Sequence, residues 1–129
     1  MAENGQLRRV VAIVDDDAFI RAGLGRLVRS IGYDPLLFGE AGALLSYGAV
    51  EALFCVLADL QMPGVNGVEL IQLLTRRHPS LPVVAMTAYP SDAIRQRALE
   101  AGAAAYLTKP FDAALLEDCL SNFSSQRKS

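Results

Sequence analysis

Short apolar runs alternate with longer amphipathic segments along the whole chain, and no change in composition marks a linker between them. The runs have the length of buried strands, and the amphipathic segments carry apolar residues at helical spacing. The predicted strands cover residues 10–14, 33–38, 53–58, 82–87 and 104–108. The predicted helices, with their capping residues, cover 17–32, 40–48, 68–77, 91–102 and 112–123. This alternation predicts an α/β fold, with a doubly wound parallel sheet and helices on both of its faces.

Capping residues and one proline indicate where these elements begin, end and lie. Asp17 and Ser91 are N-cap types ahead of the first and fourth helices, and Gly32 and Gly102 follow the last turns of the same helices. Pro35 lacks the amide hydrogen that an inner strand needs, so we expect the second strand at an edge of the sheet. The apolar stripe predicted to face the sheet from the first helix consists of Phe19, Ile20, Leu24, Leu27, Val28 and Ile31.

The composition limits the class of protein. The chain has 129 residues, 52% hydrophobic and 20% charged, which fits one packed domain rather than a disordered segment. A net charge of -2 and a pI near 5.3 argue against a nucleic-acid binder. No apolar run reaches the roughly 18 residues of a membrane span. Cys55 and Cys119 lie within apolar runs and are expected to be reduced core thiols. We therefore expect a cytoplasmic protein that binds neither nucleic acid nor membrane.

Four of the five predicted strands end in polar or charged residues. These residues are Asp15, Asp16 and Asp17 after the first strand, Asp59 after the third, Thr87 after the fourth and Lys109 after the fifth. Ligand sites of open parallel sheets lie beyond the carboxyl ends of the strands, so we expect these side chains to share one cleft. Carboxylates from two strands repel each other unless they share a cation or a proton. Oxygen ligands without a nearby His or Cys favour Mg²⁺ over Zn²⁺.

Asp59 is the best candidate for a nucleophile toward phosphorus. A metal ion on one side and an ammonium group on the other equip a carboxylate to form an acyl phosphate. Lys109 offers the ammonium group, and Thr87 offers a hydroxyl donor for a neighbouring oxygen. The Pro-Gly-rich loop at 61–67 can turn sharply and expose a main-chain carbonyl to the metal.

In their order and spacing, these residues resemble those of a response regulator receiver domain. The marks of the resemblance are Val14-Asp15-Asp16, the loop 59–67, Thr87-Ala88 and Thr108-Lys109-Pro110-Phe111. The resemblance spans residues 9–123, and we expect 124–129 to be a polar tail or the start of a linker. It implies a flavodoxin-like (βα)5 sheet with strand order 2-1-3-4-5. The segments 29–33 and 106–111 are most similar to receivers of LuxR-type, FixJ-like regulators.

The resemblance also implies a reaction and a metal site. Asp59 would accept a phosphoryl group from the phosphohistidine of a sensor histidine kinase or a phosphotransfer protein. Asp16 and Asp59 would bind Mg²⁺ directly, Asp15 would bind it mainly through water, and Gln61 would contribute its main-chain carbonyl. Such a module catalyses only its own phosphorylation and dephosphorylation and is not an enzyme in the usual sense.

A two-state switch follows from the same resemblance. Lys109 would pair with Asp59 and then with the phosphoryl group, and a cis peptide bond into Pro110 would hold its orientation. Thr87 would move to donate a hydrogen bond to the phosphoryl group, and Tyr106 would rotate inward with it. The change would be read out on the surface of the fourth helix, the fifth strand and the fifth helix, by partner binding or by homodimer formation.

Several alternatives stay open on the sequence alone. The acidic pair could be registered as Asp16-Asp17, although the N-cap role of Asp17 favours the earlier pair. Tyr89 and Pro90 follow Thr87-Ala88 where a smaller or polar residue and no proline are usual, and Gln61 lies two residues after Asp59. In this family those two places bear on phosphoryl lifetime, so the dephosphorylation rate is not predicted.

Three other functions compete with the switch. An aspartyl phosphatase would need a second acid where Gln61 stands. A non-switching scaffold would bind no Mg²⁺ near Asp59, and a flavin-binding module would need a Ser/Thr- or Gly-rich loop after the first strand. Tyr106 has an alternative as a plain core aromatic, and His78 is expected to be a solvated cation at a helix end.

Overall fold

The computed structural model describes residues 9–62 and 66–128, and for 125–128 it describes the backbone alone. Pro63, Gly64 and Val65, which belong to the loop predicted to expose a carbonyl to the metal, lie outside the described residues. The described residues form alternating strands and helices, as the hydrophobic pattern predicts.

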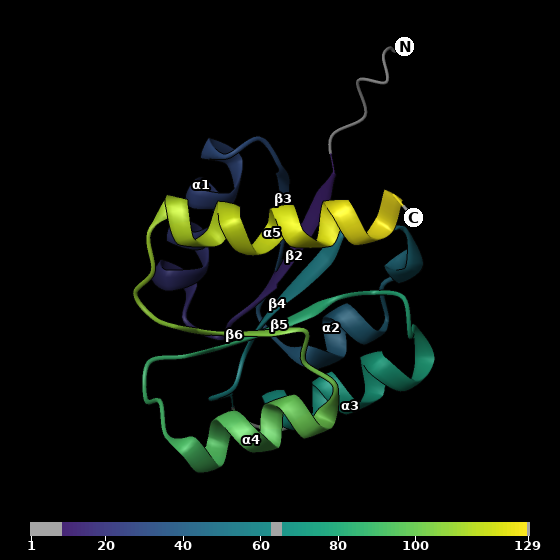
Figure 1. Ribbon diagram of the computed structural model, residues 1–129, viewed down its shortest axis with the longest axis vertical. Coiled ribbons are helices and arrows are strands. Elements are labelled where there is room, and N and C mark those ends of the chain that lie inside the picture. The colour runs from purple at the N-terminus through teal and green to yellow at the C-terminus, as the bar shows by residue number, and fades with distance from the viewer. Residues whose placement is uncertain (1–8, 63–65, 129) are drawn as a thin grey trace.

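The centre of the molecule is a parallel sheet of five strands (Figure 1). The strands are β2 (Val10–Val14), β3 (Asp34–Phe38), β4 (Cys55–Asp59), β5 (Val83–Thr87) and β6 (Ala105–Thr108). Their spatial order is β3-β2-β4-β5-β6, which is 2-1-3-4-5 in chain order and confirms the predicted fold. Because every pair is parallel, all five carboxyl ends lie at one edge of the sheet.

Helices cover both faces of this sheet. They are α1 (Ala18–Ser30), α2 (Ala41–Leu45), α3 (Gly67–Arg77), α4 (Asp92–Ala101) and α5 (Ala113–Lys128), with a short 3-10 turn, η1 (Val50–Ala52), before β4. Figure 1 shows α1 and α5 on one side of the sheet and α2, α3 and α4 on the other. None of the described helices combines the length and apolarity needed to cross a bilayer.

The two helical layers bury two separate cores against the same strands. Along β4, Val56 and Ala58 pack in the core beneath α2, α3 and α4, whereas Cys55 and Leu57 pack in the core beneath α1 and α5. Successive side chains of a strand point to opposite faces, so a strand covered on both sides must be apolar throughout. This explains why the inner strands appear in the sequence as unbroken apolar runs.

The predicted capping residues are found at the ends of the helices. The Asp17 side chain accepts hydrogen bonds from the main-chain N–H groups of Phe19 and Ile20, and the Ser91 hydroxyl accepts one from that of Ile94. Gly102 ends α4 in the left-handed region, at a φ of 115°. Pro35 lies in β3, which is an edge strand as predicted.

Two predicted details are wrong. Phe19 does not face the sheet, since its side chain is 83% exposed in the first turn of α1, and the buried residues of that helix begin with Leu24. The last helix does not end near Phe123 but continues to Lys128, because the polar residues after Phe123 include no glycine or proline that would stop it.

Candidate functional site

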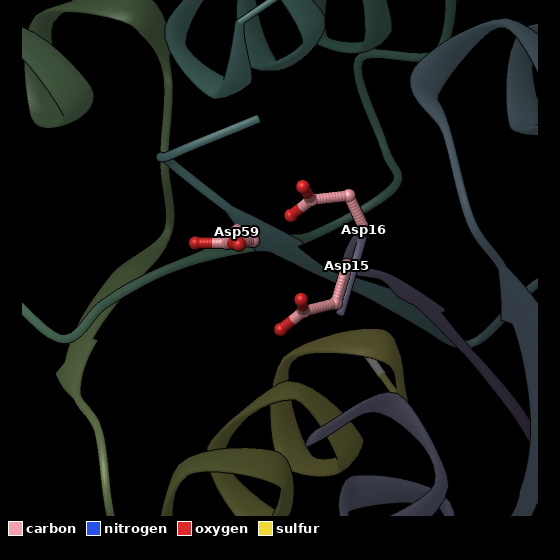
Figure 2. Close-up of side chains that lie close together, drawn as sticks. All are labelled: Asp15, Asp16 and Asp59. Atoms are coloured by element: carbon pink, nitrogen blue, oxygen red, sulfur yellow. The ribbon is translucent and has the colours of Figure 1, made fainter. Parts of the chain in front are cut away.

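Three carboxylates meet at the carboxyl edge of the sheet. Asp15 and Asp16 directly follow β2, and Asp59 is the last residue of the neighbouring strand β4. One carboxylate oxygen from each residue lies within 4.8 Å of the other two. Figure 2 shows the three carboxylate groups gathered beside one another, with each side chain leaving the end of its strand. Asp15 and Asp59 are buried, at 0% and 4% exposure, whereas Asp16 is exposed.

The main chain around Asp15 is fixed by several hydrogen bonds. Asp15 Oδ1 accepts from the N–H of Asp17 at 2.9 Å, and the Arg21 guanidinium donates to the Asp15 carbonyl at 2.6 Å. The Asp17 carboxylate is occupied at the N-terminus of α1 and is not a member of the cluster. The structure therefore supports the acidic pair Asp15-Asp16 and not the register one residue later.

One oxygen of Asp59 is held, and the other has no donor among the described residues. Asp59 Oδ1 accepts from the N–H of Gln61 at 3.1 Å and lies 3.5 Å from the Lys109 ammonium group. Within the described part of the chain, no hydrogen bond or ion pair engages Oδ2 of Asp59. Burial raises the pKa of the Asp59 carboxyl above its usual value, against the lowering effects of the Gln61 N–H and of Lys109. The nearby Asp15 carboxylate raises it further.

Lys109 bridges both buried carboxylates. Its Nζ lies 3.0 Å from Asp15 Oδ2 and 3.5 Å from Asp59 Oδ1, so the expected pairing with Asp59 is present and the closer pairing is with Asp15. The Lys109 N–H donates to the Thr87 carbonyl at 2.8 Å, and the peptide bond from Lys109 to Pro110 is cis, as predicted.

Thr87 lies at the end of β5, and its buried hydroxyl both donates and accepts a hydrogen bond. The hydroxyl donates to the side-chain Oε1 of Gln61 at 2.6 Å and accepts from the N–H of Tyr89 at 2.9 Å. The sequence predicted a contribution from Gln61 through its main-chain carbonyl and did not predict this side-chain contact. The only sequence signal for it is the position of Gln61, two residues after Asp59.

Tyr106 lies in β6, on the strand next to Thr87, and is half-buried. Its ring packs against the core beneath α2, α3 and α4. Its hydroxyl group is buried and has no hydrogen-bond partner among the described residues. A buried hydroxyl without a partner costs free energy.

The donor set of the acidic cluster fits a hard divalent cation. All three candidate ligand groups are carboxylates, and this is the one group of three or more Asp, Glu, His or Cys residues in metal-binding proximity within the described residues. Exposure of Asp16 leaves one side open to water and substrate oxygens, as magnesium sites usually require. His78 caps the C-terminus of α3 and contributes nothing to this edge of the sheet.

Comparison with known proteins assigns the fold and site to a family. Residues 11–121 match the family described as Response regulator receiver domain. The DNA-binding transcriptional regulator NtrC of Salmonella typhimurium is 35% identical over 125 residues, which cover 94% of this chain and 27% of that protein. The regulator FixJ of Bradyrhizobium diazoefficiens is 32% identical over 102 residues, which cover 79% of this chain and 50% of that protein. The chain therefore spans between about a quarter and a half of these relatives.

Solved structures agree with this assignment. A CheY-like receiver domain from Methanospirillum hungatei superposes with a TM-score of 0.85 at 28% identity, covering 95% of this chain and 98% of that one. The BeF3-activated DrrB receiver domain superposes with a TM-score of 0.83 at 25% identity, covering 92% and 99%. The chain thus belongs to the response regulator receiver domains, which are phosphoryl-accepting modules of two-component signalling rather than classical enzymes.

Proposed function

We propose that Asp59 is the residue that accepts the phosphoryl group. The observation that carries this proposal is the asymmetric setting of its carboxylate. Oδ1 is held by the Gln61 N–H and by Lys109, whereas Oδ2 has no donor among the described residues, and the carboxylate lies within the acidic cluster. A carboxylate oriented through one oxygen presents the other to an incoming phosphorus atom.

The transfer needs little covalent chemistry from the protein. Asp59 attacks the phosphorus of a phosphohistidine whose second ring nitrogen is protonated, and the new P–O bond forms as the P–N bond breaks. The electron pair of the P–N bond stays on the ring nitrogen, so the donor's imidazole leaves neutral. Lys109, already 3.5 Å from Asp59, offsets the negative charge that the phosphoryl group brings to the site. Positioning and charge compensation by existing side chains therefore account for the protein's share of the reaction.

Asp15, Asp16 and Asp59 are the residues that would hold Mg²⁺, and their all-oxygen donor set fits that ion. The main-chain carbonyl of Gln61 completes the proposed ligand set. When bound, the ion supplies neutralisation of the charge that develops on the phosphoryl oxygens. The buried Asp15 is paired with Lys109 at 3.0 Å, which favours its proposed role through water rather than by direct coordination.

Thr87 and Tyr106 are the proposed switch residues. Thr87 would turn its hydroxyl to a phosphoryl oxygen, and Tyr106 would repack in the neighbouring strand. The unpaired buried hydroxyl of Tyr106 supports this role, because a side chain that is imperfectly satisfied in one arrangement is available for another. The affected surface would be that of α4, β6 and α5.

The proposed phosphoryl donor is a sensor histidine kinase or a phosphotransfer protein, acting in the cytoplasm. The relatives include receivers of the NtrC type and of the FixJ type. The narrower assignment to a LuxR-type, FixJ-like regulator rests on the similarity of the segments 29–33 and 106–111. Residues 9–123 would form the receiver, and 124–129 would be a polar tail or the start of a linker.

Phosphorylation by a small-molecule donor tests the proposal. Wild-type protein incubated with acetyl phosphate and Mg²⁺ is expected to gain one phosphoryl group by intact mass, and hydroxylamine should remove it. Asp59→Asn should show no adduct, whereas the matched variant Asp17→Asn keeps the helix cap and should be phosphorylated normally. An undiminished adduct in Asp59→Asn, or none in the wild type, would contradict the proposal.

The proposed homodimer is tested by sedimentation. Protein saturated with beryllofluoride and Mg²⁺ should sediment faster than the unmodified protein at the same concentration, if the α4, β6 and α5 surface forms the interface. Leu99 lies on α4 and is exposed, so Leu99→Glu should abolish the shift without affecting phosphorylation. Equal sedimentation with and without the phosphoryl mimic would count against dimer formation.

A further inference from the structure

The side chain of Gln61 joins two segments that both belong to the acidic site. Its main-chain N–H donates to Asp59 Oδ1 at 3.1 Å, while its side-chain Oε1 accepts from the Thr87 hydroxyl at 2.6 Å. Gln61 lies in the loop after β4, and Thr87 lies at the end of β5. The orientation of the Thr87 hydroxyl therefore depends on a residue whose position is tied to Asp59.

The Thr87 hydroxyl has only one proton to donate. That proton is given to Gln61, and the hydroxyl oxygen accepts from the Tyr89 N–H at 2.9 Å. Thr87 is 0% exposed, so water does not compete for the hydroxyl in this arrangement. Any acceptor that appears on Asp59 must take the proton away from Gln61.

We infer that Gln61 is a positioning residue that holds the Thr87 hydroxyl in its resting orientation and so opposes the switch. This inference rests on the proposed roles of Asp59 and Thr87. Gln61 acts through Thr87 and not through the phosphoryl group. Its amide oxygen is a neutral acceptor, and the bond that it offers is the one that must break before Thr87 can move.

The Thr87 hydroxyl is expected to leave the Gln61 amide oxygen only for an acceptor that carries a charge. Hydrogen bonds to ionised oxygens are roughly twice as strong as neutral ones, so a phosphoryl oxygen outcompetes the Gln61 amide. Gln61 is an exposed residue, and water can replace the hydroxyl at its Oε1 once Thr87 leaves. The contact therefore resists spontaneous movement of Thr87 but yields after phosphorylation.

The affinity for beryllofluoride in the presence of Mg²⁺ measures this competition. Gln61→Met keeps the length of the side chain and removes the acceptor, so the mimic should bind about 2- to 10-fold more tightly than to wild type. Gln72→Met is the matched control, because Gln72 is an exposed glutamine on α3 with no hydrogen bond to the described residues. It should leave the affinity unchanged.

Variants of Thr87 separate positioning from a direct or merely structural effect. In Thr87→Ser, which keeps the hydroxyl, adding Gln61→Met should again tighten binding. In Thr87→Val, which has no proton to donate, adding Gln61→Met should change nothing. The Tyr89 amide reports the same bond without any ligand, so its NMR chemical shift should change in Gln61→Met and stay at the wild-type value in Gln72→Met.

Each outcome has one meaning. Wild-type affinity in Gln61→Met, or an equal gain in the Thr87→Val background, would overturn the role of Gln61 while leaving the proposed function intact. Failure of the wild-type protein itself to bind beryllofluoride would overturn the proposed function and the positioning role with it.

Discussion

At the level of single residues, the main feature of the site is a buried lysine that is paired with two buried carboxylates. Lys109 is the one cation in contact with both Asp15 and Asp59 among the described residues, and its side chain is only 11% exposed. The two carboxylates that it serves are almost inaccessible to water. The resting site is therefore a charge network that depends on a single ammonium group.

Removal of that ammonium group should be costly. Lys109→Met leaves two buried carboxylates without a counter-charge, and we expect the free energy of unfolding to fall by about 3 kcal/mol in metal-free buffer near neutral pH. Chemical denaturation measures the loss. Asp15→Asn in the same background should recover part of the lost stability. An unchanged denaturation midpoint in Lys109→Met would show that the ion pairs of Lys109 do not stabilise the fold.

The raised pKa of Asp59 gives a second prediction with a definite sign. Since burial favours its protonated form, the native state holds the proton more tightly than the unfolded chain, and Asp59 lowers stability as the pH rises from its ordinary pKa through the raised one. Asp59→Asn removes this penalty. In metal-free buffer its thermal midpoint should exceed that of wild type near neutral pH, and the difference should shrink as the pH falls through the same window.

Thermal unfolding monitored by circular dichroism across this pH series is the measurement. Asp34→Asn is a suitable control, since Asp34 is a partly exposed carboxylate on β3 outside the cluster. A difference between Asp59→Asn and wild type that grows toward acidic pH would contradict the assigned direction of the shift.

The sequence alone predicted that most of the site residues lie close together, because each of them follows a predicted strand. Asp15, Asp16, Asp59, Thr87 and Lys109 all follow apolar runs, and parallel strands deliver their carboxyl ends to one edge. It could not predict the bond between Gln61 and Thr87. That contact depends on how the irregular loop that carries Gln61 lies relative to the end of β5, which no periodic pattern encodes.

At the level of elements, the approach of α3 to the end of β4 is unusually close. A Cβ atom at Gly67, the first residue of α3, would lie 2.4 Å from the Asp59 carbonyl oxygen and 2.6 Å from the Leu60 Cα. Both neighbours are main-chain atoms, which cannot rotate away. A glycine here lets the helix begin directly against the strand end that carries Asp59.

Gly67→Ala should therefore destabilise the fold by about 1–3 kcal/mol and weaken Mg²⁺ binding, since the strand end or the helix must shift. Chemical denaturation and a Mg²⁺ titration followed by NMR check the two effects. Gly48→Ala is the matched control, because nothing lies within 4 Å of a Cβ atom there. Normal stability and Mg²⁺ affinity in Gly67→Ala would show that the contact is not required.

The element boundaries show what sequence signals can and cannot fix. Helix ends marked by a cap were predicted well, as at Asp17, Ser91 and Gly102, because each cap satisfies main-chain groups locally. The end of α5 was missed because loss of apolar periodicity was taken as the end of the helix, although a polar segment can continue one. The exposure of Phe19 was missed because periodicity does not show where the sheet beneath a helix ends.

At the level of the whole molecule, the acidic cluster couples global stability to a ligand. Three carboxylates held within 4.8 Å of one another oppose folding unless their charge is offset. A cation that binds this arrangement and not the unfolded chain must stabilise the folded state.

Mg²⁺ should therefore raise the thermal midpoint of the wild-type protein. At ten times its dissociation constant, the ion adds about 1.4 kcal/mol to the free energy of unfolding. Asp16→Asn should reduce this gain, and NaCl at matched ionic strength should produce much less of it, since screening acts weakly on buried charges. Equal midpoints in Mg²⁺ and in matched NaCl would argue against a specific cation site.

The side chains of β4 alternate between the two cores, which also limits where residues can be inserted into the chain. One residue inserted between Cys55 and Asp59 would move the preceding or following side chains of the strand to the opposite face. The same insertion would separate Asp59 from its neighbours, so a defect in packing and a defect in the site would arise together. The turn around Gly48, between α2 and η1, is free of this constraint and is the place where a peptide tag or fluorescent label can be introduced.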